Sequence, residues 1–217
     1  MQEYIVGIDL GGMSAKVALF DAEGKILGKT TVITRASDGF EGTAEKLADA
    51  AKAAAEKAGV PFGSVRAVGI ASPGVVNSKT GVVLKWGNYG WLNVPLGETV
   101  EKLTGKEVYV ANDANAAALG EAKFGASAVY ESSIFITLGT GVGGGIIHRQ
   151  AFDQLSLCVQ QSTVLLELVG VTGLLCGLEH GKHGVVDIQF QNLIALYAFA
   201  AGLLGQHFFH LNGQRAV

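Results

Sequence analysis

An Asn-Asp pair at residues 112 and 113 is the clearest candidate for acid–base chemistry. The apolar residues 108–111 before it predict a strand, and residues 112–123 predict a helix. Where strands and helices alternate, a carboxylate at the carboxyl end of a strand lies where ligands bind. Asp113 could therefore accept the proton of an attacking hydroxyl, and Asn112 could hydrogen-bond a neighbouring hydroxyl. The pair could equally be a plain helix cap.

A second candidate is the segment from Asp9 to Lys16, in which a Gly-Gly turn, Gly11 and Gly12, follows a predicted strand. An aspartate at this position could hold a metal ion through water. The amides of the turn and Lys16 could then face phosphate oxygens. A β-hairpin with an exposed lysine is the alternative.

Residues 139–145 contain five glycines in seven positions after the apolar strand 133–138. Such a loop can turn several backbone amides toward one anion, and the missing side chains let a phosphate approach. The spacing G-x-G-x-x-G is present, but Ile146 and Ile147 follow where a dinucleotide-binding fold needs a helix, so we do not predict such a cofactor. A glycine-rich hairpin without a ligand is the alternative.

The segment from Trp86 to Trp91 (WGNYGW) offers aromatic faces and the amide of Asn88 on a predicted loop. This is a surface that could receive a sugar. It could equally be a loop packed over the core.

The elements that must position these residues follow an α/β pattern. Strands over 4–10, 15–20 and 26–33 predict an antiparallel meander, and Asp38 with Glu41 has the spacing of a capping box at the start of a helix that ends near Gly59. A strand over 65–70 runs into a rigid loop at 71–74, and a helix follows over 95–103. The alternation predicts an α/β domain with a mixed sheet.

Composition narrows the classes of protein. The 217 residues carry 16 basic and 19 acidic side chains, a net charge of −3, so no basic surface for nucleic acid is expected. Two cysteines make no disulfide framework, and no signal peptide is apparent at the start, so we expect a cytoplasmic protein. The apolar run at 193–204 is shorter than the roughly 20 residues of a membrane helix, and no membrane association is expected.

Five segments in this order, GIDLGG with its following Lys, ASPGVVN, WGNYGW, NDANAAALGEAKFGA and LGTGVGGGII, resemble the ROK (repressor, open reading frame, kinase) family of sugar kinases, and its glucokinases in particular. The resemblance covers about residues 5–147. It implies the actin-like ATPase (ribonuclease H-like) fold, with two α/β lobes, and transfer of the γ-phosphoryl group of MgATP to a sugar hydroxyl. It also implies a homodimer.

The resemblance assigns roles to individual residues. Asp113 matches the catalytic base, Asn88 and Asn112 match ligands of sugar hydroxyls, and Gly74 matches a close backbone approach to the sugar. The first phosphate loop corresponds to Asp9, Gly11, Gly12 and Lys16, with Asp9 holding Mg²⁺ through water, and the second to Gly139, Thr140, Gly141 and Gly143.

The chain departs from the family pattern at Met13, where the family has threonine, and after Ile147. The family's Glu-x-Gly-His and cysteine-rich zinc elements are absent there, so we predict no zinc site; Cys176, His180 and His183 supply three ligands where a structural site needs four. Residues 148–217 hold 3 of the 16 basic and 4 of the 19 acidic residues.

These departures define the expected domains: an amino-terminal lobe over 1–118 and an incomplete or atypical second lobe over 119–217, with a tail foreign to the family from about 148. A frameshift near codon 148 is our hypothesis for the tail. The expected function is phosphorylation of a hexose, glucose first. The alternative is a non-catalytic remnant or pseudokinase that binds nucleotide at most. A ROK repressor would need a helix-turn-helix before Tyr4, where we see no room for one.

Overall fold

A computed structural model describes residues 3–138, 142–148 and 151–152. The helices are α1 (Gly39–Lys57), α2 (Leu96–Thr104) and α3 (Asp113–Phe124), with short 3-10 turns η1 (Ala36–Asp38), η2 (Phe62–Ser64) and η3 (Gly87–Tyr89). The strands are β1 (Tyr4–Leu10), β2 (Ser14–Phe20), β3 (Ile26–Ile33), β4 (Val65–Ser72), β5 (Val75–Asn77), β6 (Val82–Trp86), β7 (Trp91–Val94), β8 (Glu107–Asn112), β9 (Ser133–Leu138), β10 (Val142–His148) and β11 (Ala151–Phe152).

The main sheet is mixed, with the strand order β3-β2-β1-β4-β8. Strands β1, β2 and β3 form the predicted antiparallel meander, whereas β4 and β8 run parallel to β1. The register places Asp9 beside Ala71 and Ser72 beside Asn112. The carboxyl ends of the three parallel strands, and the polar residues there, therefore meet at one edge of the sheet.

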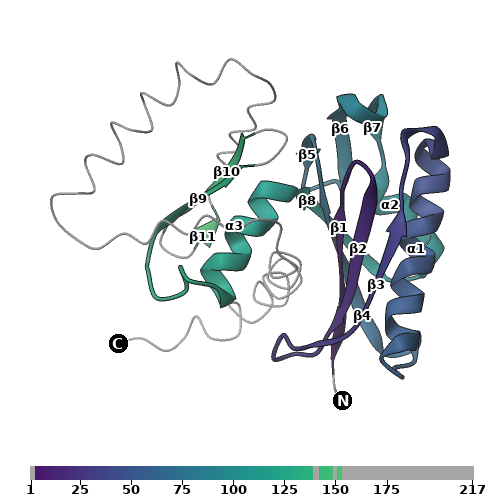
Figure 1. Cartoon of the computed structure of the whole chain (residues 1–217), viewed down its shortest axis with the longest axis horizontal. Coiled ribbons are helices and arrows are strands. Elements are labelled where there is room, and N and C mark those ends of the chain that lie inside the picture. The colour runs from purple at the N-terminus through teal and green to yellow at the C-terminus, as the bar shows by residue number, and fades with distance from the viewer. Residues whose placement is uncertain (1–2, 139–141, 149–150, 153–217) are drawn as a thin grey trace, which may run out of the picture.

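Helices cover both faces of this sheet (Figure 1). The alanine-rich helix α1 turns its buried residues, among them Ala44, Leu47, Ala51 and Ala55, into the main core with β1–β3. On the other face lies α3, which packs Ala116 against Ala71 and contacts β9 and β10 with its far side. Helix α3 thus lies between the main sheet and the β11-β10-β9 sheet.

Three local predictions need correction. Residues 142–148 form β10 and pair with β9, so the predicted glycine loop over 139–145 does not extend past residue 141. The WGNYGW segment belongs to a three-stranded β5-β6-β7 sheet, because Trp86 pairs with Trp91. The Asp38 carboxylate does not cap α1: it accepts the Arg35 amide at 2.7 Å and pairs with Lys46 at 2.7 Å.

Other predictions concern residues that lie partly or wholly outside the described ranges. The predicted boundary after residue 118 falls inside α3, and the division into lobes stays a prediction. The apolar run at 193–204, Cys176, His180 and His183 lie outside the described residues. Within the described part, no helix is long and apolar enough to cross a membrane.

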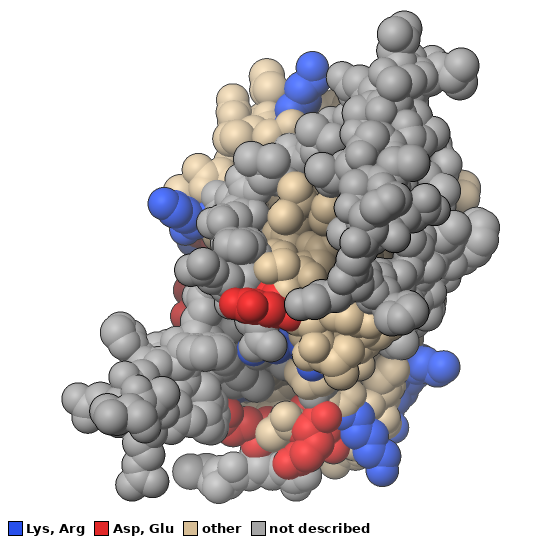
Figure 2. All heavy atoms as spheres, turned by 90° about the vertical axis from the view of Figure 1, so that its left-hand side faces the viewer, with Lys and Arg blue, Asp and Glu red and all other residues tan. Residues whose placement is uncertain are grey.

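Charge is dispersed on the side of the molecule where β9 and α3 lie. Among the described residues of this face, the basic side chains lie in separate places and form no continuous basic stripe (Figure 2). The absence of nucleic-acid binding stays a prediction.

Candidate active site

The amino-terminal end of α3 fixes the candidate base. Asn112 ends β8 in an extended conformation, and its Oδ1 accepts the amides of Ala114 at 3.1 Å and Asn115 at 3.3 Å, which satisfies two of the free amides of the first helical turn. Asp113 is therefore the first residue of the helix, where the positive end of the helix dipole favours a carboxylate. The strand–helix junction predicted for this pair is confirmed.

Asn112 also joins α3 to the loop after β4. Its Nδ2 donates to the carbonyl of Gly74 at 3.0 Å, and the side chain is buried. Gly74 has a φ of +88°, and a Cβ at this position would lie 2.2 Å from the carbonyl oxygen of Lys85 on β6. Only glycine fits here. The Gly74 loop is thus held between β6 and the amino-terminal end of α3.

Asp9 and Lys16 face each other across the β1–β2 hairpin. They are paired in the register, with Nζ 4.0 Å from Oδ2. Burial raises the pKa of the Asp9 carboxyl above its ordinary value, and the positive charge of Lys16 offsets part of this rise.

The carboxyl group of Asp113 is electrostatically linked to that of Asp9. Asp113 keeps an exposed edge toward solvent, but the protein around its carboxyl group raises its pKa by desolvation. The hydrogen bond from the Ala114 amide lowers this pKa in part, and the negative charge of Asp9 raises it again. The structure therefore brings the two acidic candidates into one site, and a base with a raised pKa is better matched to neutral pH.

The Gly11-Gly12 turn is held in place by hydrogen bonds donated to its carbonyl oxygens. Gly11 O accepts the Thr34 hydroxyl at 3.2 Å, Gly12 O accepts the Tyr89 hydroxyl at 3.3 Å, and Met13 O accepts the Thr34 amide at 3.2 Å. In the part of the chain that the structure describes, the hydrogen bonds outside helices and strands do not use the amides of Gly12 and Met13. These amides are the groups with which a turn of this kind binds an anion.

The WGNYGW segment does not offer aromatic faces to a ligand. Trp86, Tyr89 and Trp91 are buried, with Trp86 stacked on Tyr89 and Trp91 edge-on to both, so the interpretation as a packed segment is confirmed for the three rings. Asn88, by contrast, is exposed. The hydrogen bond from Tyr89 to Gly12 brings η3, and Asn88 with it, beside the β1–β2 turn.

The glycines of β10 have a packing role. A Cβ on Gly145 would lie 2.5 Å from the Cβ of Ala118, and one on Gly143 would lie 3.0 Å from the Cβ of Ala114. These glycines let β10 approach α3 closely. A phosphate role for Gly143 stays a prediction, and Gly139, Thr140 and Gly141 lie outside the described residues.

The donors at this edge fit Mg²⁺. Among the described residues, no group of three His, Cys, Asp or Glu side chains could enclose a metal ion. Mg²⁺ that accompanies a nucleotide takes one or two carboxylates and fills its remaining positions with water and phosphate oxygens. Asp9 supplies one carboxylate of this kind, and the negative charge of Asp113 acts on it. The role of Asp9 as a ligand of Mg²⁺ stays a prediction.

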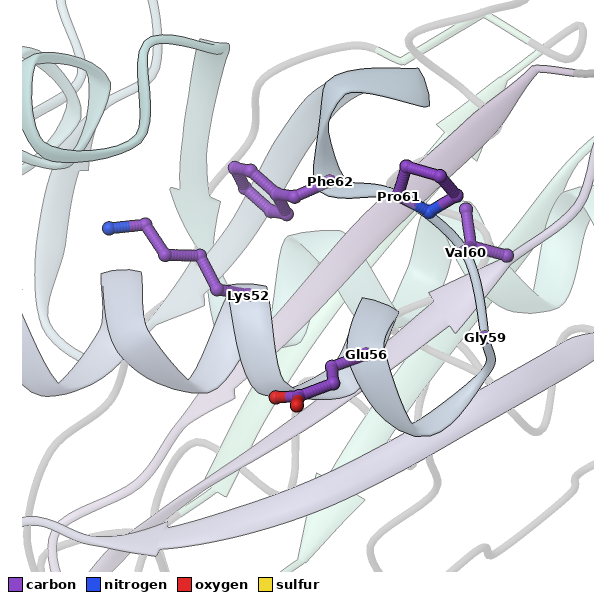
Figure 3. Close-up of a pocket in the computed structure, with 6 residues that line it drawn as sticks. All are labelled: Lys52, Glu56, Gly59, Val60, Pro61 and Phe62. Atoms are coloured by element: carbon purple, nitrogen blue, oxygen red, sulfur yellow. The ribbon is translucent and has the colours of Figure 1, made fainter.

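A hollow of about 490 Å³ lies elsewhere on the molecule, between the end of α1 and η2 (Figure 3). It is lined by Lys52, Glu56, Gly59, Val60, Pro61 and Phe62. These residues precede β4 and so lie toward its amino end, whereas ligands of α/β sheets bind at the carboxyl ends of strands. The hollow is not part of the candidate site.

Comparison with known proteins identifies the family. The sequence model of the ROK family matches residues 5–154. The chain belongs to the ROK family. ROK kinases have the actin-like ATPase fold, and the mixed α/β sheet of this chain agrees with it.

Several of the relatives carry the name glucokinase. The glucokinase of Thermotoga maritima is 39% identical over 144 residues, which cover 66% of this chain and 44% of that protein. The glucokinase of Streptomyces coelicolor is 40% identical over 195 residues, which cover 90% of this chain and 58% of that protein. The crystal structure of a ROK glucokinase from Streptomyces griseus with glucose and AMPPNP is 41% identical, has a TM-score of 0.59, and matches 70% of this chain and 46% of its own.

The chain spans about half the length of the curated relatives it matches. An alignment over 90% of the chain extends beyond residues 5–154. It therefore gives no support to the expectation that everything after Ile147 is foreign to the family. The origin of this segment stays a prediction.

Proposed function

We propose that the chain catalyses the transfer of the γ-phosphoryl group of ATP to a hydroxyl of a hexose, with glucose as the first candidate. The observation that carries the proposal is the meeting of Asp113, Asp9 and the Gly11-Gly12 turn at the carboxyl edge of the parallel strands. A base, a negative site for Mg²⁺ and free turn amides are the parts that phosphoryl transfer needs, since its catalysis is mainly positioning and charge stabilisation. The glucokinase relatives suggest the sugar.

In the proposed mechanism, Asp113 accepts the proton of the attacking sugar hydroxyl. The hydroxyl oxygen forms a bond to the γ-phosphorus, the bond between this phosphorus and the bridging oxygen breaks, and ADP leaves. Asn88 and the Gly74 loop orient the sugar. Mg²⁺, which Asp9 would hold through water, neutralises phosphate charge when it is bound.

On the nucleotide side, the amides of the Gly11-Gly12 turn and the ammonium group of Lys16 bind phosphate oxygens. The second phosphate loop, Gly139, Thr140, Gly141 and Gly143, completes this side of the proposed site. Asn112 acts mainly through position, because its Oδ1 caps α3 and one N–H of its Nδ2 is engaged by Gly74. A homodimer and a cytoplasmic location stay predictions.

The test is ADP release by the 217-residue chain with MgATP and glucose, mannose or N-acetylglucosamine. Asp113→Asn removes the base and keeps the shape of the side chain. Asp49→Asn, on the exposed side of α1, is the matched control. We expect sugar-dependent ADP release, a loss of at least about 100-fold in Asp113→Asn, and no change in the control.

Two results would contradict the proposal. A chain that is folded by circular dichroism and releases no ADP with any of the sugars is not an active kinase of these sugars. If it still binds AMPPNP, the non-catalytic alternative is favoured. Near-normal turnover in Asp113→Asn would reject Asp113 as the base.

A further inference from the structure

The β1–β2 turn is oriented by hydrogen bonds from two residues of distant segments, Thr34 and Tyr89. Its three consecutive carbonyl oxygens, those of Gly11, Gly12 and Met13, accept hydrogen bonds from Thr34 and Tyr89. Because the carbonyls point toward these donors, the hydrogen bonds restrain the peptide planes of the turn. The amides of Gly12 and Met13 stay available for an anion.

Of these two donors, Tyr89 is attached to the other half of the site. It is the last residue of η3 and follows Asn88, which the proposed function assigns to the sugar. Its ring stacks on Trp86 with a centroid distance of 3.8 Å and an angle of 8°, and lies edge-on to Trp91 at 5.6 Å. The residue is 8% exposed. Since the ring is held on two sides, its hydroxyl cannot move independently of η3.

The Gly74 loop packs on β6, the strand that ends at Trp86. A Cβ on Gly74 would lie 3.1 Å from the Cβ of Trp86 and 2.2 Å from the carbonyl oxygen of Lys85. The buried rings next to β6 thus support both the loop that approaches the sugar and the residue that orients the phosphate turn. A rearrangement of η3 would therefore move both the Gly74 loop and the Gly11-Gly12 turn.

We propose that Tyr89 is a positioning residue that orients the Gly11-Gly12 turn for phosphate and couples this turn to the sugar loop. The inference rests on the proposed function for the identity of the two ligands. Occupation of the sugar side orders η3, and the Tyr89 hydroxyl passes this order to the turn, so glucose and nucleotide each raise the affinity for the other by the same factor.

The variant Tyr89→Phe isolates this role, because it keeps the packed ring and removes only the hydroxyl. Tyr109→Phe is the matched control: its hydroxyl donates to Glu107 on β8 and does not touch the turn. Hydrogen–deuterium exchange of a peptide over residues 8–16 reports on the turn without any ligand. We expect this peptide to exchange about threefold faster in Tyr89→Phe and unchanged in Tyr109→Phe, since a bond as long as 3.3 Å contributes at the low end of the usual range.

The second measurement is the affinity for AMPPNP with and without glucose, read from tryptophan fluorescence. The two tryptophans of the chain, Trp86 and Trp91, both lie against Tyr89, so the signal comes from the supporting rings. In the unmodified chain, glucose should tighten AMPPNP binding by about threefold or more. In Tyr89→Phe this factor should fall to near one, while Tyr109→Phe keeps it.

The outcomes separate this inference from the proposed function. Equal exchange of residues 8–16 in the unmodified chain and in Tyr89→Phe overturns the positioning role, and an undiminished glucose effect in Tyr89→Phe overturns the coupling. A chain that binds neither glucose nor AMPPNP refutes the proposed function and the coupling together. The exchange experiment still decides, in that case, whether Tyr89 orients the turn.

Discussion

Asn112 should be the residue on which the geometry of the site depends most. The residue is 6% exposed, and its side chain makes three hydrogen bonds: two as acceptor at the start of α3 and one as donor to the Gly74 carbonyl. Asn112→Ala removes all three. Loss of the cap costs about 1 kcal/mol and an unpaired buried carbonyl costs about 1–3 kcal/mol, so we expect the free energy of unfolding to fall by about 2–4 kcal/mol.

A second substitution divides this loss. Serine caps helices about as well as asparagine but is too short to reach Gly74 and lacks the amide donor. Asn112→Ser should therefore lose only the part that belongs to the Gly74 carbonyl, about 1–3 kcal/mol. The difference between the alanine and serine variants gives the contribution of the cap.

The assay is urea unfolding followed by far-ultraviolet circular dichroism, with the slopes compared to verify that the same surface unfolds. Asn77→Ala is the control, because the Asn77 side chain is on the surface and accepts only the amide of Lys79. It should change the unfolding free energy by less than about 0.5 kcal/mol. If Asn112→Ser is as stable as the unmodified chain, the bond to Gly74 does not hold the loop. If Asn112→Ala is also as stable as the unmodified chain, the burial and hydrogen bonds of Asn112 do not contribute to stability.

Three further predictions concern the same edge of the sheet. In the folded chain the pKa of the Asp113 carboxyl is raised above its ordinary value of 3.8. The folded state therefore gains stability from the protonated carboxyl at acid pH, and it loses this stability as the pH rises through the raised pKa. Asp113→Asn, which should lower ADP release at least about 100-fold, should therefore be at least as stable as the unmodified chain at pH 7 in urea unfolding, and a less stable variant would contradict the raised pKa. Gly145→Ala should lower the unfolding free energy by about 1–3 kcal/mol, because its Cβ would overlap Ala118; no change would show that β10 shifts freely. Gly74→Ala should reduce stability by more than about 1 kcal/mol and raise the KM for the sugar, as its Cβ meets the Lys85 backbone at a positive φ; unchanged unfolding and kinetics would refute this.

The sequence predicted most of the elements that carry the site, because local signals agree there. The apolar alternation of residues 4–10, the Gly-Gly turn and the strand–helix junction at Asn112 each depend on neighbours in the chain, and the structure has them where expected. The approach of Asp9 to Asp113 follows from topology, since parallel strands bring their carboxyl ends to one edge.

Side-chain partners across long distances were beyond local reasoning. Thr34 and Tyr89 hold the Gly11-Gly12 turn from 23 and 77 residues away, and the bond from Asn112 to Gly74 spans 38 residues. No spacing rule marks such pairs. The one local signal was the position of Tyr89 beside Asn88, in a segment whose aromatic residues suggested a ligand surface but form a buried cluster.

The glycines after β9 show why composition alone does not identify a phosphate site. Gly143 and Gly145 are required where α3 approaches β10, and a Cβ at 143 would press on Ala114, the neighbour of Asp113. A larger residue at 143 would therefore disturb the first turn of α3 and, through this packing contact, the position of the candidate base Asp113. Loss of activity in such a variant would not demonstrate contact with phosphate. Evidence for that contact has to come from nucleotide affinity measured in a variant whose α3 is unchanged.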